Sequence, residues 1–233
     1  NIKFTTFLFL FDDGTVGAIG DKGTRTPIAY VVKDKTDTEK GMAMALQPVY
    51  ATFSRYNGGT DPGPALDNSA QFDETNWLTD MDGYRYTWEA NGSMDGVTIK
   101  ANEPEKCPAF YHAAHYNPGV TVTGSNLSKW YLGANTDWKN LYLYVGFGTN
   151  TKVNAASSPV PWYYHIVDKA FIDAGGTTVS VTEPNVNVKA YWSSTYYRDF
   201  NTGILNIHKN NYIDGNHSIS DKDKLYIRAF IHY

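Results

Sequence analysis

The chain has 233 residues, of which 42% are hydrophobic and 19% charged, and its formal net charge at pH 7 is −4. This balance is typical of a globular protein with a sizeable core and excludes a polyelectrolyte or a disordered chain. Because the chain is acidic and its basic residues are scattered, we expect no nucleic-acid partner. The single cysteine, Cys107, excludes an intrachain disulfide and is expected to be a small buried residue.

Aromatic residues make up 15% of the chain, a share typical of extracellular β-rich and sugar-binding domains. No segment approaches 18 consecutive apolar residues, so the sequence predicts no transmembrane helix. The opening NIKFTTFLFLFDDG lacks a basic segment followed by a small-residue cleavage site, and we interpret it as a strand at the start of a processed chain. Membrane anchoring by a segment outside this chain stays open.

The N-terminal part of the chain is predicted to be mostly sheet. Residues 4–11 are β-rich and lead to Asp13-Gly14, a strong tight-turn signal. The segments TPIAYVVKD (26–34) and GMAMALQPV (41–49) indicate two further strands, the first of them central. Residues 57–75 carry Gly, Pro, Asn and Asp at a density that predicts a long loop.

Three helices are predicted in the middle of the chain. The first covers EPEKCPAFYHAAHYN (103–117), about three turns with a proline near the start. The second covers NTDWKNLYLYVG (135–146), begins at residue 135 or 136 and has apolar residues at spacings of three and four. The third covers PWYYHIVDKAFIDAGG (161–176), which begins with proline and ends with two glycines.

The C-terminal part returns to sheet. VKAYWSST (188–195), GILNIHK (203–209) and KLYIRAFIHY (224–233) carry β-branched and aromatic residues between turn signals and predict three strands. Strands at both ends with helices between them indicate an α+β fold, in which the final strand is expected to pair near the first. We predict a single elaborated domain over residues 1–233, with a possible N-terminal β subregion at 1–56.

Ser193 and Ser194 lie in AYWSSTYYRDF, where a serine has two interpretations. A nucleophilic serine would need a base, for which His165 and His208 are available, but the sequence has no G-x-S-x-G turn there. In a strand, alternate side chains would point to opposite faces and the hydroxyls would bond to the backbone of crossing loops. We favour the strand interpretation and predict no catalytic residue.

Two pairs of side chains are candidates for metal ligands, and each has a simpler interpretation. His112 and His115 share one face of a predicted helix, but they lack the HExxH pattern and suit a helix surface equally well. Asp80 and Asp82 supply the oxygen ligands that calcium favours, but the rest of an EF-hand loop is missing and an Asx-type turn explains them as well.

The tripeptide Glu183-Pro184-Asn185 occurs in sugar-binding C-type lectins, where its side chains bracket calcium. The companion Trp-Asn-Asp strand of those lectins is missing, because the following strand contains YWSST. We therefore predict no metal ion and no cofactor.

Seven segments occur in a familiar order: DDGTVG, GMAMAL, DMDGYRYT, CPAFYHAAHYN, KWYLGANTDWKNLY, YWSSTYY and KLYIRAF. The most specific are the W-x-L-x(4)-D-W pattern, formed by Trp130, Leu132, Asp137 and Trp138, and YWSST with the closing Y-I-R-x-F. In this order the chain resembles a group of Bacteroidetes surface proteins related to the Fibrobacter major paralogous domain and to the C-terminal domain of Legionella collagen-like protein. It departs from them at Gly133-Ala134, where the family commonly has Leu-Pro-Ser or Leu-Pro-Thr.

The resemblance implies a C-type-lectin-like fold, shared with formylglycine-generating enzyme, in an exported and often anchored protein. The catalytic cysteine pair of those enzymes cannot exist in a chain with one cysteine, so the resemblance implies the fold and not that activity. We expect a mixed sheet with two or three helices and long loops. Structural roles are predicted for Trp130, Leu132, Trp138, Trp192, Ser193, Ser194, Thr195 and Arg228.

The main functional hypothesis is a non-enzymatic bacterial domain, extracellular or on the outer-membrane surface, that binds a glycan or a host or bacterial surface protein. Tyrosine rings can stack on sugars and polar side chains can bond their hydroxyls, so the candidate ligand-binding residues are Tyr196, Tyr197, Arg198, Asp199, Asn201, Asn210 and Asn211. One alternative is a structural subunit of a pilus or envelope assembly, in which the N-terminal strand or the C-terminal AFIHY edge pairs with another chain. A second alternative is an enzyme of unrecognised type.

Overall fold

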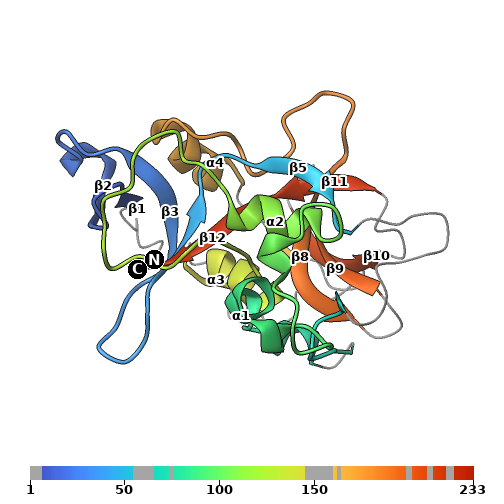
Figure 1. Cartoon of the computed structure of the whole chain (residues 1–233). Coiled ribbons are helices and arrows are strands. Elements are labelled where there is room, and N and C mark those ends of the chain that lie inside the picture. The colour runs from blue at the N-terminus through green and yellow to red at the C-terminus, as the bar shows by residue number, and fades with distance from the viewer. Residues whose placement is uncertain are drawn as a thin grey trace.

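The computed structural model describes residues 7–54, 66–73, 76–144, 160–161, 164–197, 201–208, 212–218 and 223–233. In these residues the chain forms two six-stranded sheets with α-helices packed against them and long loops between (Figure 1). The predicted α+β class is confirmed.

Sheet A contains strands from both ends of the chain. Its strand order is β2-β1-β3-β4-β12-β6, and every neighbouring pair is antiparallel. The final strand shares this sheet with the first, but β3 and β4 separate the two. The strands of sheet A are β1 (Leu8–Phe11), β2 (Val16–Ala18), β3 (Pro27–Lys33), β4 (Met42–Ala45), β6 (Tyr131–Leu132) and β12 (Ala229–His232).

Sheet B is mixed and has the order β5-β11-β8-β9-β10-β7. Strands β11 and β8 are parallel, with Tyr226 opposite Tyr191, and the other neighbouring pairs are antiparallel. The predicted strand 188–195 is therefore a central strand beside the YIR segment. The strands of sheet B are β5 (Val49–Thr52), β7 (Val160–Pro161), β8 (Val188–Tyr197), β9 (Asn201–His208), β10 (Tyr212–Ser218) and β11 (Lys224–Ile227).

Two segments pass from one sheet to the other while they remain paired. Residues 42–52 supply β4 and then β5, and residues 224–232 supply β11 and then β12. Ile227 lies opposite Val49 and Phe230 opposite Met44, so two residues on one segment face four on the other. The predicted single strand 224–233 is therefore two strands, because the chain changes sheet at Arg228.

The side chain of Arg228 is completely buried at this crossing. Its Nη1 donates to the carbonyl oxygens of Ala45 (3.1 Å) and Leu46 (2.6 Å), where the extra residues of the opposite segment lie. Its Nη2 donates to the carbonyl oxygens of Thr177 (2.8 Å) and Thr178 (2.9 Å). A planar guanidinium has enough donors to satisfy several carbonyl groups at once, which a lysine ammonium reaches less well.

Three of the α-helices correspond to predicted ones with shifted ends, and α1 (Gly83–Trp88) was not predicted. The others are α2 (Pro108–Ala114), α3 (Asn135–Tyr144) and α4 (Tyr164–Asp173), with 3₁₀ turns η1 (Ile19–Asp21), η3 (Trp77–Thr79), η4 (Ala90–Gly92) and η5 (Lys100–Asn102). The first predicted helix, 103–117, is only the seven residues of α2, because residues before Pro108 form turns. The third begins at Tyr164, since Pro161 belongs to β7. The predicted end at Gly146 lies outside the described residues.

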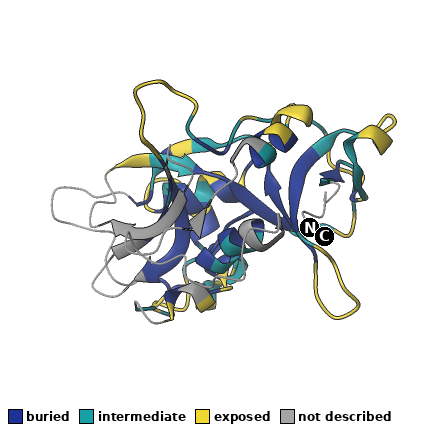
Figure 2. Cartoon of the chain, turned by 180° about the vertical axis from the view of Figure 1, so that it is seen from behind, coloured by how far each residue is buried: buried dark blue, intermediate teal, exposed yellow. Residues whose placement is uncertain are grey.

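Alternate residues of β4 pack into two different hydrophobic clusters. Met42 and Met44 belong to the cluster that contains residues of α3 and α4, whereas Ala43 and Ala45 belong to the cluster that contains residues of α2. Because successive side chains of a strand point to opposite faces, the centre of sheet A is buried on both sides. Figure 2 shows this as buried residues along the central strands.

The buried guanidinium of Arg228 gives a stability prediction. Arg228→Lys keeps the positive charge but leaves carbonyl groups at the crossing unbonded, so we expect the free energy of unfolding to fall by about 2–4 kcal/mol. Arg25→Lys is the matched control, because Arg25 also donates to backbone carbonyls but is only partly buried. We expect that control to change stability by less than about 1 kcal/mol. Equal losses in urea denaturation would contradict the role given to Arg228.

Candidate functional site

The strand that contains the serines has an irregular register. Trp192 lies opposite Ile204 and Tyr196 opposite Thr202, so three residues of β8 face the single residue Gly203. A Cβ atom at Gly203 would come within 3.0 Å of the Thr195 carbonyl oxygen, which explains a glycine there. The simple alternation expected for this strand fails at the bulge.

Ser193, Ser194 and Thr195 are fully buried, and Ser194 and Thr195 join β8 to neighbouring segments. The Thr195 hydroxyl accepts a hydrogen bond from the backbone N–H of Asn135 (2.8 Å), the first residue of α3. The backbone N–H of Ser194 donates to the carbonyl oxygen of Gly133 (2.8 Å). In the described part of the chain, neither serine hydroxyl is hydrogen-bonded to an imidazole, and neither is accessible to a substrate.

Two buried carboxyl groups lie beside this strand. Asp137 reaches back from the first turn of α3 and accepts from the backbone N–H of Ala134 (2.8 Å), while Asp80 Oδ1 accepts from the N–H of Asp82 (3.1 Å). Burial raises the pKa of Asp80 to about 6 and raises that of Asp137 well above its usual value. The hydrogen bond from the Asp82 N–H to Asp80 Oδ1 forms an Asx-type turn. The carboxylate of Asp82 pairs with Arg85 at 2.7 Å.

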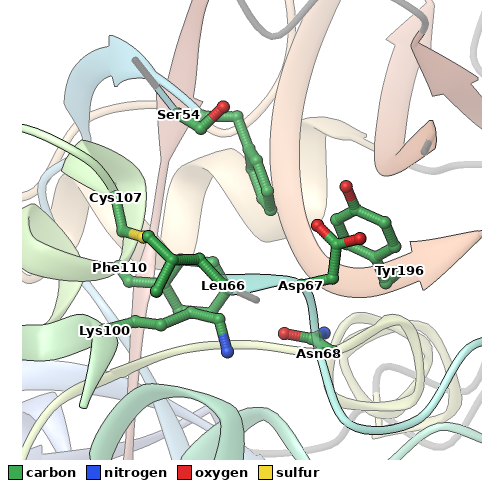
Figure 3. A pocket seen from close by; sticks show the side chains of 9 residues that line it. Ser54, Leu66, Asp67, Asn68, Lys100, Cys107, Phe110 and Tyr196 are labelled. Carbon is green, nitrogen blue, oxygen red and sulfur yellow. The ribbon is translucent and has the colours of Figure 1, made fainter. Parts of the chain in front are cut away.

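A small cavity lies between α2, η5, β8 and residues 66–68 of the predicted long loop (Figure 3). Its volume is about 20 Å³, which is room for roughly one water molecule. The lining residues are Phe53, Ser54, Leu66, Asp67, Asn68, Lys100, Cys107, Phe110 and Tyr196. The prediction that Cys107 is buried is confirmed.

Lys100 is the buried cation of this cavity and is 1% exposed. Its Nζ donates to the carbonyl oxygen of Gly92 (3.0 Å) and the hydroxyl of Ser93 (2.9 Å), and it makes a longer contact of 3.5 Å with the carbonyl oxygen of Tyr86. Burial lowers the pKa of Lys100 to about 8. Sequence reasoning missed this residue because no motif or periodicity distinguishes it from a surface lysine.

The predicted ligand-binding residues do not form a visible surface site. Tyr196 lies in β8, is 6% exposed and lines the cavity, so its ring is not the open stacking face that we expected. Tyr197 and Asn201 are paired across β8 and β9, and their side chains are outside the described residues. The remaining candidates, Arg198, Asp199, Asn210 and Asn211, also lie outside the described residues.

The other polar motifs are on the surface. His112 and His115 are exposed, and the His115 Nδ1–H donates to the carbonyl oxygen of Tyr111 (2.9 Å). The carboxylate of Glu183 accepts from the backbone N–H of Thr182 (3.2 Å) in an exposed turn. Among the described residues, no group of three or more His, Cys, Asp or Glu side chains is arranged to hold a metal ion.

The buried carboxyl of Asp80 gives a pH prediction. Its pKa is about 6 in the folded chain against 3.8 as the reference, so the folded state binds more protons between these values. The Asp80 contribution therefore lowers the free energy of unfolding as the pH rises from about 4 to about 6. We expect Asp80→Asn to raise the free energy of unfolding by about 1–3 kcal/mol near neutral pH and to leave it unchanged below about pH 4.

Urea denaturation at a series of pH values measures this difference, and Asp82→Asn is the control. The Asp82 side chain is half exposed and paired with Arg85, so its replacement should change stability by less than about 1 kcal/mol. Parallel pH profiles for the wild type and Asp80→Asn would contradict the burial argument.

Comparison with known proteins gives a likeness in fold. No protein-family model matches the chain, and no curated protein matches it in sequence. The structure is similar to that of a fimbrial protein from Bacteroides ovatus, with a TM-score of 0.60 and 13% sequence identity. The alignment covers 99% of this chain and 49% of the fimbrial protein, so the chain spans about half the length of that protein.

No helix among the described residues is long and apolar enough to cross a membrane. The resemblance to the Fibrobacter and Legionella family stays a prediction.

Proposed function

We propose that the chain is a structural subunit of a bacterial fimbria or a related surface assembly. The observation that supports this function is the fold likeness to a fimbrial protein, which extends over 99% of the chain at a TM-score of 0.60. The buried YWSST strand is consistent with a structural role, because the Thr195 hydroxyl accepts from the Asn135 N–H and the backbone N–H of Ser194 donates to the carbonyl oxygen of Gly133.

The positions of the strands restrict how subunits could meet. We expected the N-terminal strand or the C-terminal AFIHY segment to offer an edge, but β1 lies between β2 and β3, and β12 lies between β4 and β6. Both edges of each strand are therefore occupied. In sheet B the first strand of the order, β5, is an edge strand, and its Tyr50 side chain is 57% exposed. An exposed edge strand is a natural place for another chain to pair.

Recognition of a glycan or a surface protein stays a prediction for this chain. Of the residues proposed to contact such a ligand, Tyr196 is buried. A recognition role is compatible with a surface assembly, since a fimbrial subunit can also carry a binding surface. The assembly role is the one supported by the fold likeness.

Immunogold electron microscopy tests the assembly role. We expect antibodies against the purified chain to label filaments on intact cells that produce it, and deletion of the gene to remove these filaments. Label that appears only after the cells are permeabilised would contradict a surface assembly. Label spread over the cell surface, with filaments unchanged in the deletion strain, would favour the recognition role.

Complementation of the deletion strain can test the β5 edge. We expect Tyr50→Lys to reduce the number of filaments several-fold, because a charge on an edge strand opposes pairing with another chain. Val97→Lys is the matched control, since Val97 is 77% exposed and lies outside the strands. Equal filament numbers for the two variants would exclude the β5 edge as an assembly contact.

A further inference from the structure

The cavity beside α2 brings an amine and a carboxamide together inside the protein. Lys100 and Asn68 both line it, and each is 1% exposed. Figure 3 shows the amine of Lys100 and the amide of Asn68 turned into the same space. Phe53, Phe110 and Tyr196 also line this cavity, so the surroundings of the two groups are largely apolar.

The backbone holds the two groups on neighbouring segments. Asn68 pairs with Ser93 in an isolated antiparallel bridge, and the N–H of Ser69 donates to the carbonyl oxygen of Gly92 (3.0 Å). The Nζ of Lys100 donates to that same carbonyl oxygen and to the Ser93 hydroxyl. The amine is therefore anchored on the segment to which Asn68 is paired, and no domain movement is needed to bring the groups together.

The amide of Asn68 is fixed by one of its two polar atoms. Its Nδ2 donates to the carbonyl oxygen of Ser194, whereas its Oδ1 is buried and has no hydrogen-bond partner among the described residues. The carboxamide is therefore held in place through Nδ2, and its Oδ1 is available to accept a hydrogen bond that would stabilise the negative charge formed on attack.

The amine of Lys100 can provide a lone pair. Burial lowers the pKa of Lys100 to about 8, so roughly a tenth of the molecules carry the free amine near neutral pH. A neutral amine has two hydrogens, which suffice for the two short bonds to Gly92 and Ser93. The long contact of 3.5 Å with the Tyr86 carbonyl oxygen is the one that deprotonation removes, and the lone pair then takes no part in a hydrogen bond.

We propose that Lys100 and Asn68 form an intramolecular isopeptide bond. The Nζ of Lys100 attacks the side-chain carbonyl carbon of Asn68, the carbon–Nδ2 bond breaks, and Nδ2 leaves as ammonia. One proton passes from Nζ to the leaving nitrogen, and Asp67 is the carboxyl group among the lining residues that can transfer it. The reaction is an amide exchange, so it needs no oxidant, reductant or further reactant.

The bond would close a covalent ring that contains α1 and η4. A ring of this kind restricts the unfolded chain as a disulfide does, in a protein whose single cysteine excludes an internal disulfide. This inference does not depend on the proposed function, because it concerns only the chemistry of the cavity.

Mass spectrometry of the purified full chain tests the proposal. We expect an intact mass lower than that of the sequence by one ammonia molecule. Trypsin should fail to cleave after Lys100, and the digest should contain a branched peptide in which residues 56–85 are joined to residues 86–106. Fragmentation of that peptide should place the link at Asn68 and Lys100.

Two variants separate this bond from other causes of mass loss. Lys100→Arg should have the full mass of its sequence, since the guanidinium is not a comparable nucleophile. Lys106→Arg is the control and should still lose one ammonia, because Lys106 is exposed and pairs with Glu103. The wild-type measurement decides the question even if Lys100→Arg does not fold.

Three results would overturn the proposal. The first is a folded wild-type chain with its full mass and normal cleavage after Lys100. The second is loss of one water molecule in place of ammonia, which would assign the bond to a carboxyl group such as that of Asp67. The third is loss of ammonia that persists in Lys100→Arg.

Discussion

The fold depends on one buried cation, the guanidinium of Arg228, at the point where two paired segments leave one sheet and join the other. The register offset at this point leaves Ala45 and Leu46 without a partner residue on the segment 224–232, and Arg228 donates to both of their carbonyl oxygens. The charge lies 4.8 Å from the centre of the Phe171 ring, so α4 also contacts it. Burial lowers the pKa of Arg228, but arginine starts so high that the group stays charged. A charged donor of fixed geometry is thus what allows the chain to change sheets inside the core.

The same principle, a buried side chain that serves backbone groups of irregular segments, recurs through the molecule. The segment after α4 has no regular structure, and its backbone is held by Arg228 at Thr177 and Thr178 and by Asp168, which accepts from the N–H groups of Val179 and Ser180. In β8, the Thr195 hydroxyl plays this role for the start of α3. Long loops therefore become part of the rigid body through polar side chains, because buried backbone groups must find partners. This explains hydroxyl and charged residues in a core without any need for bond-breaking chemistry.

The sequence predicted the elements whose signals are local and missed those that tertiary structure decides. The start of α3 at Asn135 and the α+β class followed from capping and periodicity. The strand 224–233 was predicted as one element, since its break depends on the offset opposite Arg228 and not on any turn residue nearby. The six-residue α1 was not predicted, because so short a helix has no clear periodicity. Asn68 and Lys100 come together only through the bridge to Ser93, and no spacing rule connects them.

The occupied edges of β1 and β12 constrain any assembly of this chain. A segment in the middle of an antiparallel sheet has its backbone groups already bonded, so it can pair with a second chain only if a neighbouring strand first leaves. One neighbour of β12 is the two-residue strand β6, and the other is β4, whose departure would separate the segments at the Arg228 crossing, since β4 and β5 are parts of one continuous segment. Removal of that segment would break the hydrogen bonds from Arg228 to Ala45 and Leu46 and expose the apolar residues of β4 to water. Such an exchange lowers stability, so subunits that keep this fold are joined more favourably through the existing edge strands.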